Sequence, residues 1–207
     1  MSKRLIHRIA AAAVLLSASS VTASAHHLMG GKMPASFADG LLSGLGHPII
    51  GIDHLAILIA AGLATGIAGL SLAIPAVFVA GSAVGVALHV NAVTIPGSEL
   101  LVALTVIAAG LLLAFGRGLP LLKWAVLFAA AGVLHGYAYG ESIFGAESTP
   151  LWAYLIGLVV IQTALSIAIA LAARRTKLDA SAVNARLAGA ALAGVGLAVL
   201  AGQVIPA

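Results

Sequence analysis

The sequence has no cysteine, and only 8% of its 207 residues are charged while 62% are apolar. Without cysteine the chain has no disulfide bond, iron–sulfur cluster, thiolate nucleophile or lipid attached through sulfur. Soluble domains carry about 25% charged residues, so these few charges cannot cover the surface of a water-soluble globule. The same composition excludes a disordered chain and a coiled coil. A small bundle of membrane helices is the class that fits.

Two enzyme motifs are also absent from the sequence. It has no G-x-x-x-x-G-K-[S/T] phosphate loop, so we do not expect ATP hydrolysis by this chain, and no H-E-x-x-H metalloprotease motif. The net charge is +4, but Lys3, Arg4 and Arg8 supply most of it and leave seven basic residues against six acidic ones. The basic balance therefore does not indicate nucleic-acid binding.

The first 25 residues have the pattern of a removable secretion signal. Three basic residues precede the apolar run Ile9–Leu16, and the segment ends in Ala23-Ser24-Ala25, an A-x-A cleavage pattern. The apolar run is too short to span a membrane comfortably, which disfavours the alternative of an uncleaved first helix. We expect cleavage after Ala25, giving a signal peptide at 1–25 and a transmembrane domain at 26–207.

Six apolar segments follow, and most reach the roughly 20 residues that a transmembrane helix needs. They are continuously apolar and rich in Ala, Leu and Gly, which favours helices over the alternating strands of a barrel. We therefore expect an all-α polytopic membrane protein with six transmembrane helices after the signal peptide. The predicted spans are Leu41–Ala64, Leu70–Val90, Leu100–Phe115, Leu119–Tyr139, Leu151–Ala173 and Leu187–Ile205.

The charges between these segments predict an orientation. A cleaved signal places the mature N-terminus outside the cytoplasmic membrane, and six spans return the C-terminus to the same side. The connections predicted to be cytoplasmic then carry Arg117, Arg174, Arg175, Lys177 and Arg186, whereas the outer ones carry Glu99, Glu141 and Glu147. This agrees with the positive-inside rule, with Lys32 as the exception. We expect a bacterial cytoplasmic (inner) membrane protein with both mature termini on the periplasmic side.

Ionisable residues inside a span cost about 2.5–3.5 kcal/mol each on insertion scales and usually mark a functional site. Here they gather in the predicted outer half of the membrane. The first group is His47-Pro48-Ile49-Ile50-Gly51-Ile52-Asp53-His54. Pro48 suits the first turn of a helix with His47 at the cap, and His54, seven residues on, would share the face of His47. Asp53 is either a ligand or a group that orients an imidazole from another helix, and Gly51 leaves room for close approach.

The second group lies at the end of the fourth span. His135 is followed by Gly136, Gly140 and Glu141, and the two glycines permit close packing within the chain or between two chains. We expect the tyrosines between them, Tyr137 and Tyr139, in the interfacial aromatic belt.

Several other polar residues admit two interpretations. His89 is either a polar helix end or a ligand, and the dipole of a helix N-terminus would stabilise Glu99 even without a metal. His26-His27, at the start of the mature chain, is either a flexible end or a cation-capturing segment. Gln162 predicts a hydrogen bond between helices. We assign Lys32, Asp39 and Glu147 to solvated loops.

Imidazole and carboxylate ligands without thiolate suit divalent Ni, Co, Zn, Cu or Mn, whereas Mg and Ca sites use more oxygen ligands. At these residues the chain resembles the HupE/UreJ family of small membrane proteins, which is associated with nickel supply to hydrogenase and urease. The resemblance is carried by H-P-x-x-G-x-D-H at 47–54 and H-G-x-A-x-G-E at 135–141. Where family members often have Phe and His in the second motif, this chain has Leu134 and Tyr139. The resemblance implies uptake of Ni²⁺, or of Co²⁺, at His47, Asp53, His54, His135 and Glu141, with His26, His27, His89 and Glu99 as additional candidate ligands.

The expected function is a secondary or channel-like permease that imports a divalent metal ion across the cytoplasmic membrane. Ni²⁺ is the first candidate for this ion and Co²⁺ the second. Two alternatives stay open: a membrane metal sensor or chaperone that binds without transport, and an intramembrane metalloenzyme with Glu141 as general base. We expect no enzyme activity, no resident cofactor and no nucleic-acid partner. The expected partners are the divalent ion, the lipid bilayer and the maturation proteins of nickel enzymes; the sequence leaves the oligomeric state open.

Overall fold

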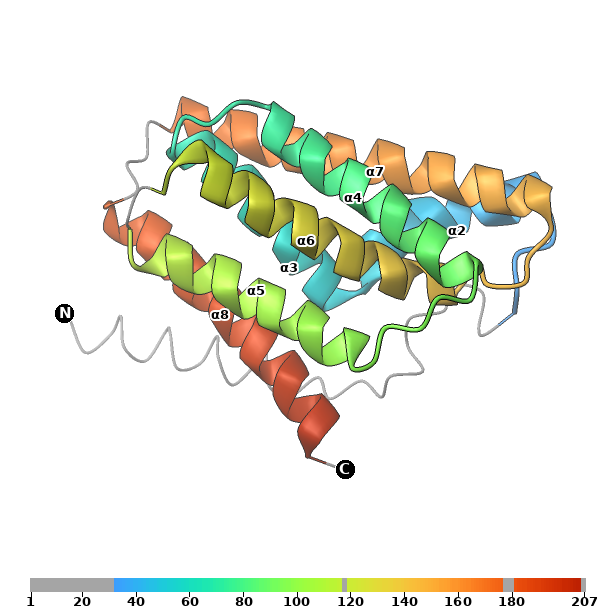
Figure 1. Cartoon of the computed structure of the whole chain (residues 1–207). Coiled ribbons are helices and arrows are strands. Elements are labelled where there is room, and N and C mark those ends of the chain that lie inside the picture. Colours follow the sequence, from blue (N-terminus) through green and yellow to red (C-terminus); the bar gives the residue numbers. More distant parts are fainter. Residues whose placement is uncertain (1–31, 117–118, 177–180, 206–207) are drawn as a thin grey trace.

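The computed structural model describes residues 32–116, 119–176 and 181–205 (Figure 1). The predicted signal peptide, His26, His27, Arg117 and Lys177 lie outside these ranges. Within these ranges all regular secondary structure is helical, which confirms the all-α prediction for the described part of the chain. The helices are α2 Phe37–Ile50, α3 Ile52–Ile67, α4 Ala73–Val90, α5 Ser98–Ala114, α6 Leu121–Glu141, α7 Ser148–Arg175 and α8 Val183–Val204.

The helices are long and apolar enough for a multi-pass membrane protein. Among the described residues, α4, α6, α7 and α8 can each cross a membrane by length and composition, and α2 with α3 makes a fifth candidate if the pair is one bent span. The apolar helix α5 is shorter, at 17 residues. Each of the six predicted segments thus coincides with a helix or a bent pair, while the number of crossings stays a prediction.

The first predicted span is not one continuous helix. It is divided at Gly51 into α2 and α3, which are bent by 77° to each other. The prediction that Pro48 opens a helix with His47 at its cap is wrong, because both residues lie in the last turn of α2. Proline has no N–H to donate to the preceding turn, and Gly51 is extended, with φ −70° and ψ 110°. Both features end α2 at this point.

The start of α2 is fixed by a reciprocal cap. The Asp39 backbone N–H donates to Ser36 Oγ at 3.1 Å, and the Ser36 N–H donates to Asp39 Oδ2 at 3.1 Å. This is a capping box, which satisfies two donors that a helix end leaves without partners. The assignment of Asp39 to a solvated loop is therefore wrong, whereas Lys32 and Glu147 are exposed as predicted.

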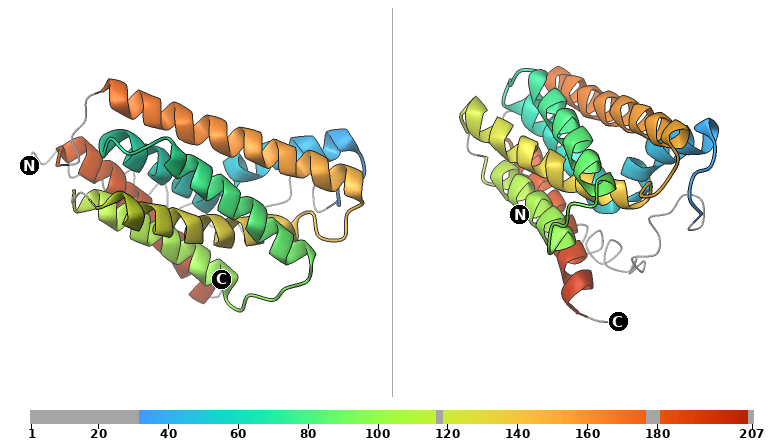
Figure 2. Two further views of the ribbon diagram at one scale, coloured as in Figure 1. Left: turned by 45° about the horizontal axis from the view of Figure 1, so that its top comes forward. Right: turned by 45° about the vertical axis from the view of Figure 1, so that its right-hand side comes forward.

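Helix α3 lies in the middle of the bundle and packs against α2, α4, α5, α6, α7 and α8 (Figure 1). Its buried side chains include Ile57 and Leu58, which join Phe78 of α4 and Phe128 of α6 in the main apolar core. Figure 2 shows α2 at the end of the bundle, beside the start of α7. The α2–α3 break thus lies where the central helix meets this end.

Helices α4 and α6 approach so closely that glycine is required between them. A Cβ atom added to Gly136 would lie 2.1 Å from Ser82 O, and one added to Gly85 would lie 2.1 Å from Val133 O. The glycines of the second motif therefore pack within the chain. The prediction that Gln162 bonds between helices is also confirmed, because its Nε2 donates to Ser82 Oγ of α4 at 3.1 Å.

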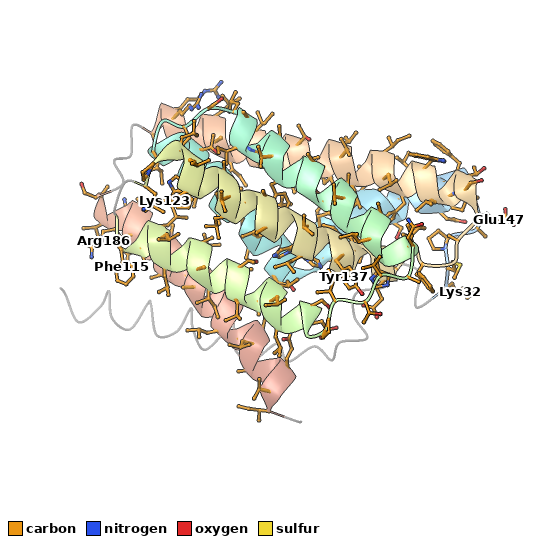
Figure 3. All side chains as sticks on the ribbon, in the orientation of Figure 1. Lys32, Phe115, Lys123, Tyr137, Glu147 and Arg186 are labelled. Carbon is orange, nitrogen blue, oxygen red and sulfur yellow. The ribbon has the colours of Figure 1, made fainter. Side chains whose placement is uncertain are left out.

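Charged residues divide between the two ends of the bundle (Figure 3). The basic end carries Lys123, Arg174, Arg175 and Arg186, and the acidic end carries Glu99, Glu141 and Glu147. Lys32 is the exception, because it lies at the acidic end (Figure 3). At the basic end Arg186 donates to Ala114 O at 2.9 Å, and Arg174 donates to Leu70 O. Between the ends, large apolar side chains such as Leu104, Val126 and Val160 are exposed, as lipid contact requires.

Candidate metal centre

The predicted site residues fall into two groups in the structure. His47 of α2, Asp53 and His54 of α3, and His135 of α6 are buried together, and we call these four residues the histidine cluster. Glu141 does not join them. It lines a separate open cleft at the acidic end together with His89 and Glu99.

The break at Gly51 brings the first two histidines together. The rings of His47 and His54 have centroids 5.5 Å apart, although they belong to two different helices. The predicted proximity is therefore present, but the predicted reason, a shared face of one helix, is wrong. A Cβ atom at Gly51 would lie 2.5 Å from His54 Cδ2, so this position must be glycine for the ring to lie where it does.

Asp53 contributes a buried carboxylate at the start of α3. Its Oδ1 accepts the backbone N–H of His54 at 2.9 Å and lies 3.9 Å from His54 Nδ1, which is too far for a hydrogen bond. The N-terminus of a helix favours negative charge, so the fold stabilises this carboxylate where it lies. Asp53 thus adds a negative charge beside the imidazoles, which favours a cation over a neutral ligand.

His54 and His135 are joined directly. Their Nδ1 atoms are 2.8 Å apart, and Nε2 of His135 lies 3.0 Å from Thr105 Oγ1 of α5. Thr105 also donates to the backbone oxygen of Val102 at 2.7 Å. The cluster is therefore held by three helices, α3, α5 and α6, through side chains that are all buried.

His47 is held by a second set of hydroxyl groups. Its Nδ1 lies 2.9 Å from the hydroxyl of Tyr154 on α7 and 3.1 Å from Ser142 Oγ. Tyr154 donates to the backbone oxygen of Tyr139 at 2.8 Å. These hydrogen bonds tie the end of α2 to α7 and to the end of α6.

Tyr139 lies inside the cluster, so its assignment to the interfacial belt is wrong. Its ring centroid is 4.3 Å from that of His54 and 5.1 Å from that of His47, and the residue is fully buried. Among the described residues its hydroxyl oxygen has no hydrogen-bond partner. Tyr137 is also buried, where its hydroxyl accepts the N–H of Ile95 at 3.2 Å.

The open cleft at the acidic end is wide and polar. It has a volume of about 470 Å³. The carboxylate-bearing residues Glu99 and Glu141 are exposed, while the His89 ring packs 4.5 Å from that of Tyr137. The cleft is lined by His89, Gly97, Ser98, Glu99, Leu100, Tyr137, Glu141 and Gln203. Two carboxylates at an open surface can attract a cation before it loses its water.

Sequence reasoning missed four residues that hold the cluster: Thr105, Tyr139, Ser142 and Tyr154. Of these, only Tyr139 could have been found from the sequence, because it is four positions from His135 and therefore on the same face of a helix.

In the described ranges, no three His, Asp or Glu side chains are already placed to hold one metal ion together. Capture of an ion at the cluster therefore needs side-chain movement.

Comparisons with known proteins identify the family of the chain. The family model described as HupE / UreJ protein matches residues 13–199. The chain belongs to the HupE/UreJ family. It is also 34% identical over 168 residues to Protein HupE of Rhizobium leguminosarum bv. viciae, covering 80% of this chain and 86% of that protein. No solved structure matches the chain significantly. Both the histidine cluster and the acidic-end cleft lie largely within the part that the family model covers.

Proposed function

We propose that this HupE/UreJ protein is a permease that imports a divalent transition-metal ion, Ni²⁺ first and Co²⁺ second. The observation that carries the proposal is the histidine cluster itself. Three imidazoles and a carboxylate are buried in a bundle whose other buried side chains are mostly apolar. Such groups are costly inside a membrane protein, and they persist there when they serve transport or catalysis. Imidazole nitrogen with carboxylate oxygen is a ligand set suited to these ions.

The proposed ion path begins at the open cleft. Glu99 and Glu141 attract the hydrated cation, and His89 offers the first nitrogen. Helix α6 links the two groups, because it carries Tyr137 and Glu141 at the cleft and His135 in the cluster. The ion then loses water and binds the imidazoles of His47 and His54, with Asp53 balancing its charge. His26 and His27, outside the described ranges, remain candidates for capture before the cleft.

The proposed orientation puts the acidic end on the periplasmic side of a bacterial inner membrane. The arginines of the basic end then face the cytoplasm, as the positive-inside rule requires. Six spans after a cleaved signal leave both mature termini outside. The sequence has no phosphate loop, so the proposed transport is channel-like or driven by an ion gradient. Maturation proteins of nickel enzymes are the proposed recipients of the ion.

Uptake of radiolabelled Ni²⁺ into proteoliposomes tests this function. We expect saturable uptake by the purified chain, inhibited more strongly by Co²⁺ than by Zn²⁺. Binding of Ni²⁺ without uptake, by protein inserted in the proposed orientation, would replace transport by the sensor or chaperone function. Turnover of a substrate that stops on chelation would instead indicate a metalloenzyme.

A further inference from the structure

A chain of hydrogen bonds crosses three helices and ends at a backbone oxygen. It runs from His54 to His135 over 2.8 Å, from His135 to Thr105 over 3.0 Å, and from Thr105 to Val102 O over 2.7 Å. His54, His135 and Thr105 are all buried. In such surroundings a donor or acceptor left without its partner is strongly unfavourable, so the direction of each hydrogen bond is determined.

The backbone oxygen fixes these directions, because a carbonyl can only accept. The single hydroxyl hydrogen of Thr105 therefore goes to Val102 O, and Thr105 Oγ1 can only accept from His135. This places a hydrogen on Nε2 of His135. A neutral imidazole carries one hydrogen, so Nδ1 of His135 has a lone pair and accepts the Nδ1–H of His54. The lone pair of a neutral His54 is then on Nε2.

His47 obeys the same logic through different partners. Tyr154 has one hydrogen, and its 2.8 Å contact with the backbone oxygen of Tyr139 needs that hydrogen. Ser142 also has one hydrogen, and it donates that hydrogen to the backbone oxygen of Tyr139 or to the Tyr154 hydroxyl. The contacts of His47 Nδ1 with Tyr154 and with Ser142 Oγ then use a hydrogen on Nδ1 of His47. Both histidines of the first motif thus have the same tautomer, with the lone pair on Nε2.

We propose that Thr105 acts through His135 to hold His54 in the tautomer whose Nε2 binds the metal, and that His135 is a positioning residue instead of a ligand. Both ring nitrogens of His135 are already engaged within the protein. A metal-binding histidine commonly donates its other N–H to a fixed acceptor, and the acceptor here is Nδ1 of His135. This inference rests on the proposed function, since it names what holds the ligands of the same ion.

A substitution at Thr105 breaks the chain of hydrogen bonds without touching either histidine. Thr105→Val keeps the shape but removes the acceptor for Nε2–H of His135. His135 can then carry its hydrogen on Nδ1 and donate to His54, which moves the lone pair of His54 from Nε2 to Nδ1. Thr105→Ser keeps the hydroxyl and should keep the tautomer.

Thr65 provides a matched control on α3. It is a buried threonine whose hydroxyl donates at 2.7 Å to Ala61 O, four residues back in its own helix, much as the Thr105 hydroxyl donates to Val102 O, three residues back. Within the part of the chain that the structure describes, its side chain makes no hydrogen bond to a histidine. Thr65→Val should therefore reproduce the structural cost of Thr105→Val without its effect on the site.

The first measurement is nitrogen NMR of the metal-free protein labelled with ¹⁵N in its histidines, which distinguishes the two tautomers. We expect the Nδ1–H form for His54 in the wild type, in Thr105→Ser and in Thr65→Val, and its loss in Thr105→Val. The same Nδ1–H population in all four proteins would overturn the inference. This readout needs no metal, so it is independent of the proposed function.

The second measurement is Ni²⁺ binding to the purified chain, with X-ray absorption used to count bound imidazoles. Loss of such a supporting partner typically costs 10–100-fold in affinity, which we expect for Thr105→Val and not for Thr105→Ser or Thr65→Val. His135→Asn, whose amide oxygen can replace Nδ1 as acceptor, should keep the wild-type imidazole count, whereas His54→Asn should lose one.

Loss of an imidazole in His135→Asn would make His135 a ligand and overturn the proposal, while leaving the proposed function intact. A wild-type protein that binds neither Ni²⁺ nor Co²⁺ would instead overturn the proposed function and the ligand role of His54 with it. The NMR result would still decide whether Thr105 sets the tautomer.

Discussion

Replacing Gly136 by alanine should push α6 away from α4 and disturb the histidine cluster. The added Cβ would lie 2.1 Å from Ser82 O and 2.6 Å from Ser82 Cα, and both contacts are with backbone. Carbon atoms pack at roughly 3.5–4 Å, so the helices must separate by on the order of 1 Å. Such overpacking typically costs about 1–3 kcal/mol.

The same shift should reach the site, because His135 is the neighbour of Gly136 on α6. Its 2.8 Å contact with His54 and its 3.0 Å contact with Thr105 cannot both survive a displacement of that size. We therefore expect Gly136→Ala to lower the thermal midpoint of the purified protein and to weaken Ni²⁺ binding by about tenfold or more.

Gly194 of α8 is the matched control, because a Cβ there would meet nothing within 4 Å. Gly194→Ala should be neutral or gain up to about 1 kcal/mol from the helix preference of alanine. Thermal unfolding and Ni²⁺ calorimetry on the two variants make the comparison. If Gly136→Ala matched Gly194→Ala in both measurements, the close α4–α6 approach would not support the site.

Three further predictions concern single side chains. Asp53→Asn keeps the size of the side chain and removes its charge, so Ni²⁺ uptake should fall at least about tenfold at normal membrane abundance; normal uptake would remove Asp53 from the site. Arg174→Gln should leave Ni²⁺ affinity within about twofold, because Arg174 lies at the basic end; lost affinity in a folded protein would contradict the placement of the site. Tyr154→Phe should lower stability by about 1–2 kcal/mol through its lost hydrogen bonds, whereas Tyr139→Phe, whose hydroxyl has no partner among the described residues, should not; equal thermal midpoints for the two would refute this difference.

The helical class and the positions of most helices were predictable because lipid demands long apolar segments. The break at Gly51 was not predictable in the same way, because proline is favoured in the first turn of a helix and Pro48 therefore indicates a helix start. A local signal did exist upstream. Ser36 and Asp39 have capping-box spacing, and they place the helix start at Phe37, so that Pro48 falls near its end.

The histidine cluster was predictable from its own residues but its supports were not. The sequence pattern places four residues at a similar depth in the membrane, and the structure brings them into contact: His47, Asp53, His54 and His135. Thr105 and Tyr154 are 30 and 107 positions from the histidines they contact, and no local pattern links them.

Glu141 illustrates the opposite error, since closeness in sequence grouped it with His135. Six positions along a helix turn the side chain by about 240°, toward another face. The structure accordingly places Glu141 in the cleft with Glu99.

The most direct test of the central claim is Ni²⁺ uptake into proteoliposomes by His54→Ala compared with Gln162→Leu. Both substitutions remove a buried polar side chain, but Gln162 bonds to Ser82 outside the histidine cluster. The account predicts that His54→Ala abolishes saturable uptake while Gln162→Leu, once its amount in the vesicles is matched, retains it. Saturable uptake at the wild-type rate by His54→Ala would contradict the claim that the ion passes through the histidine cluster.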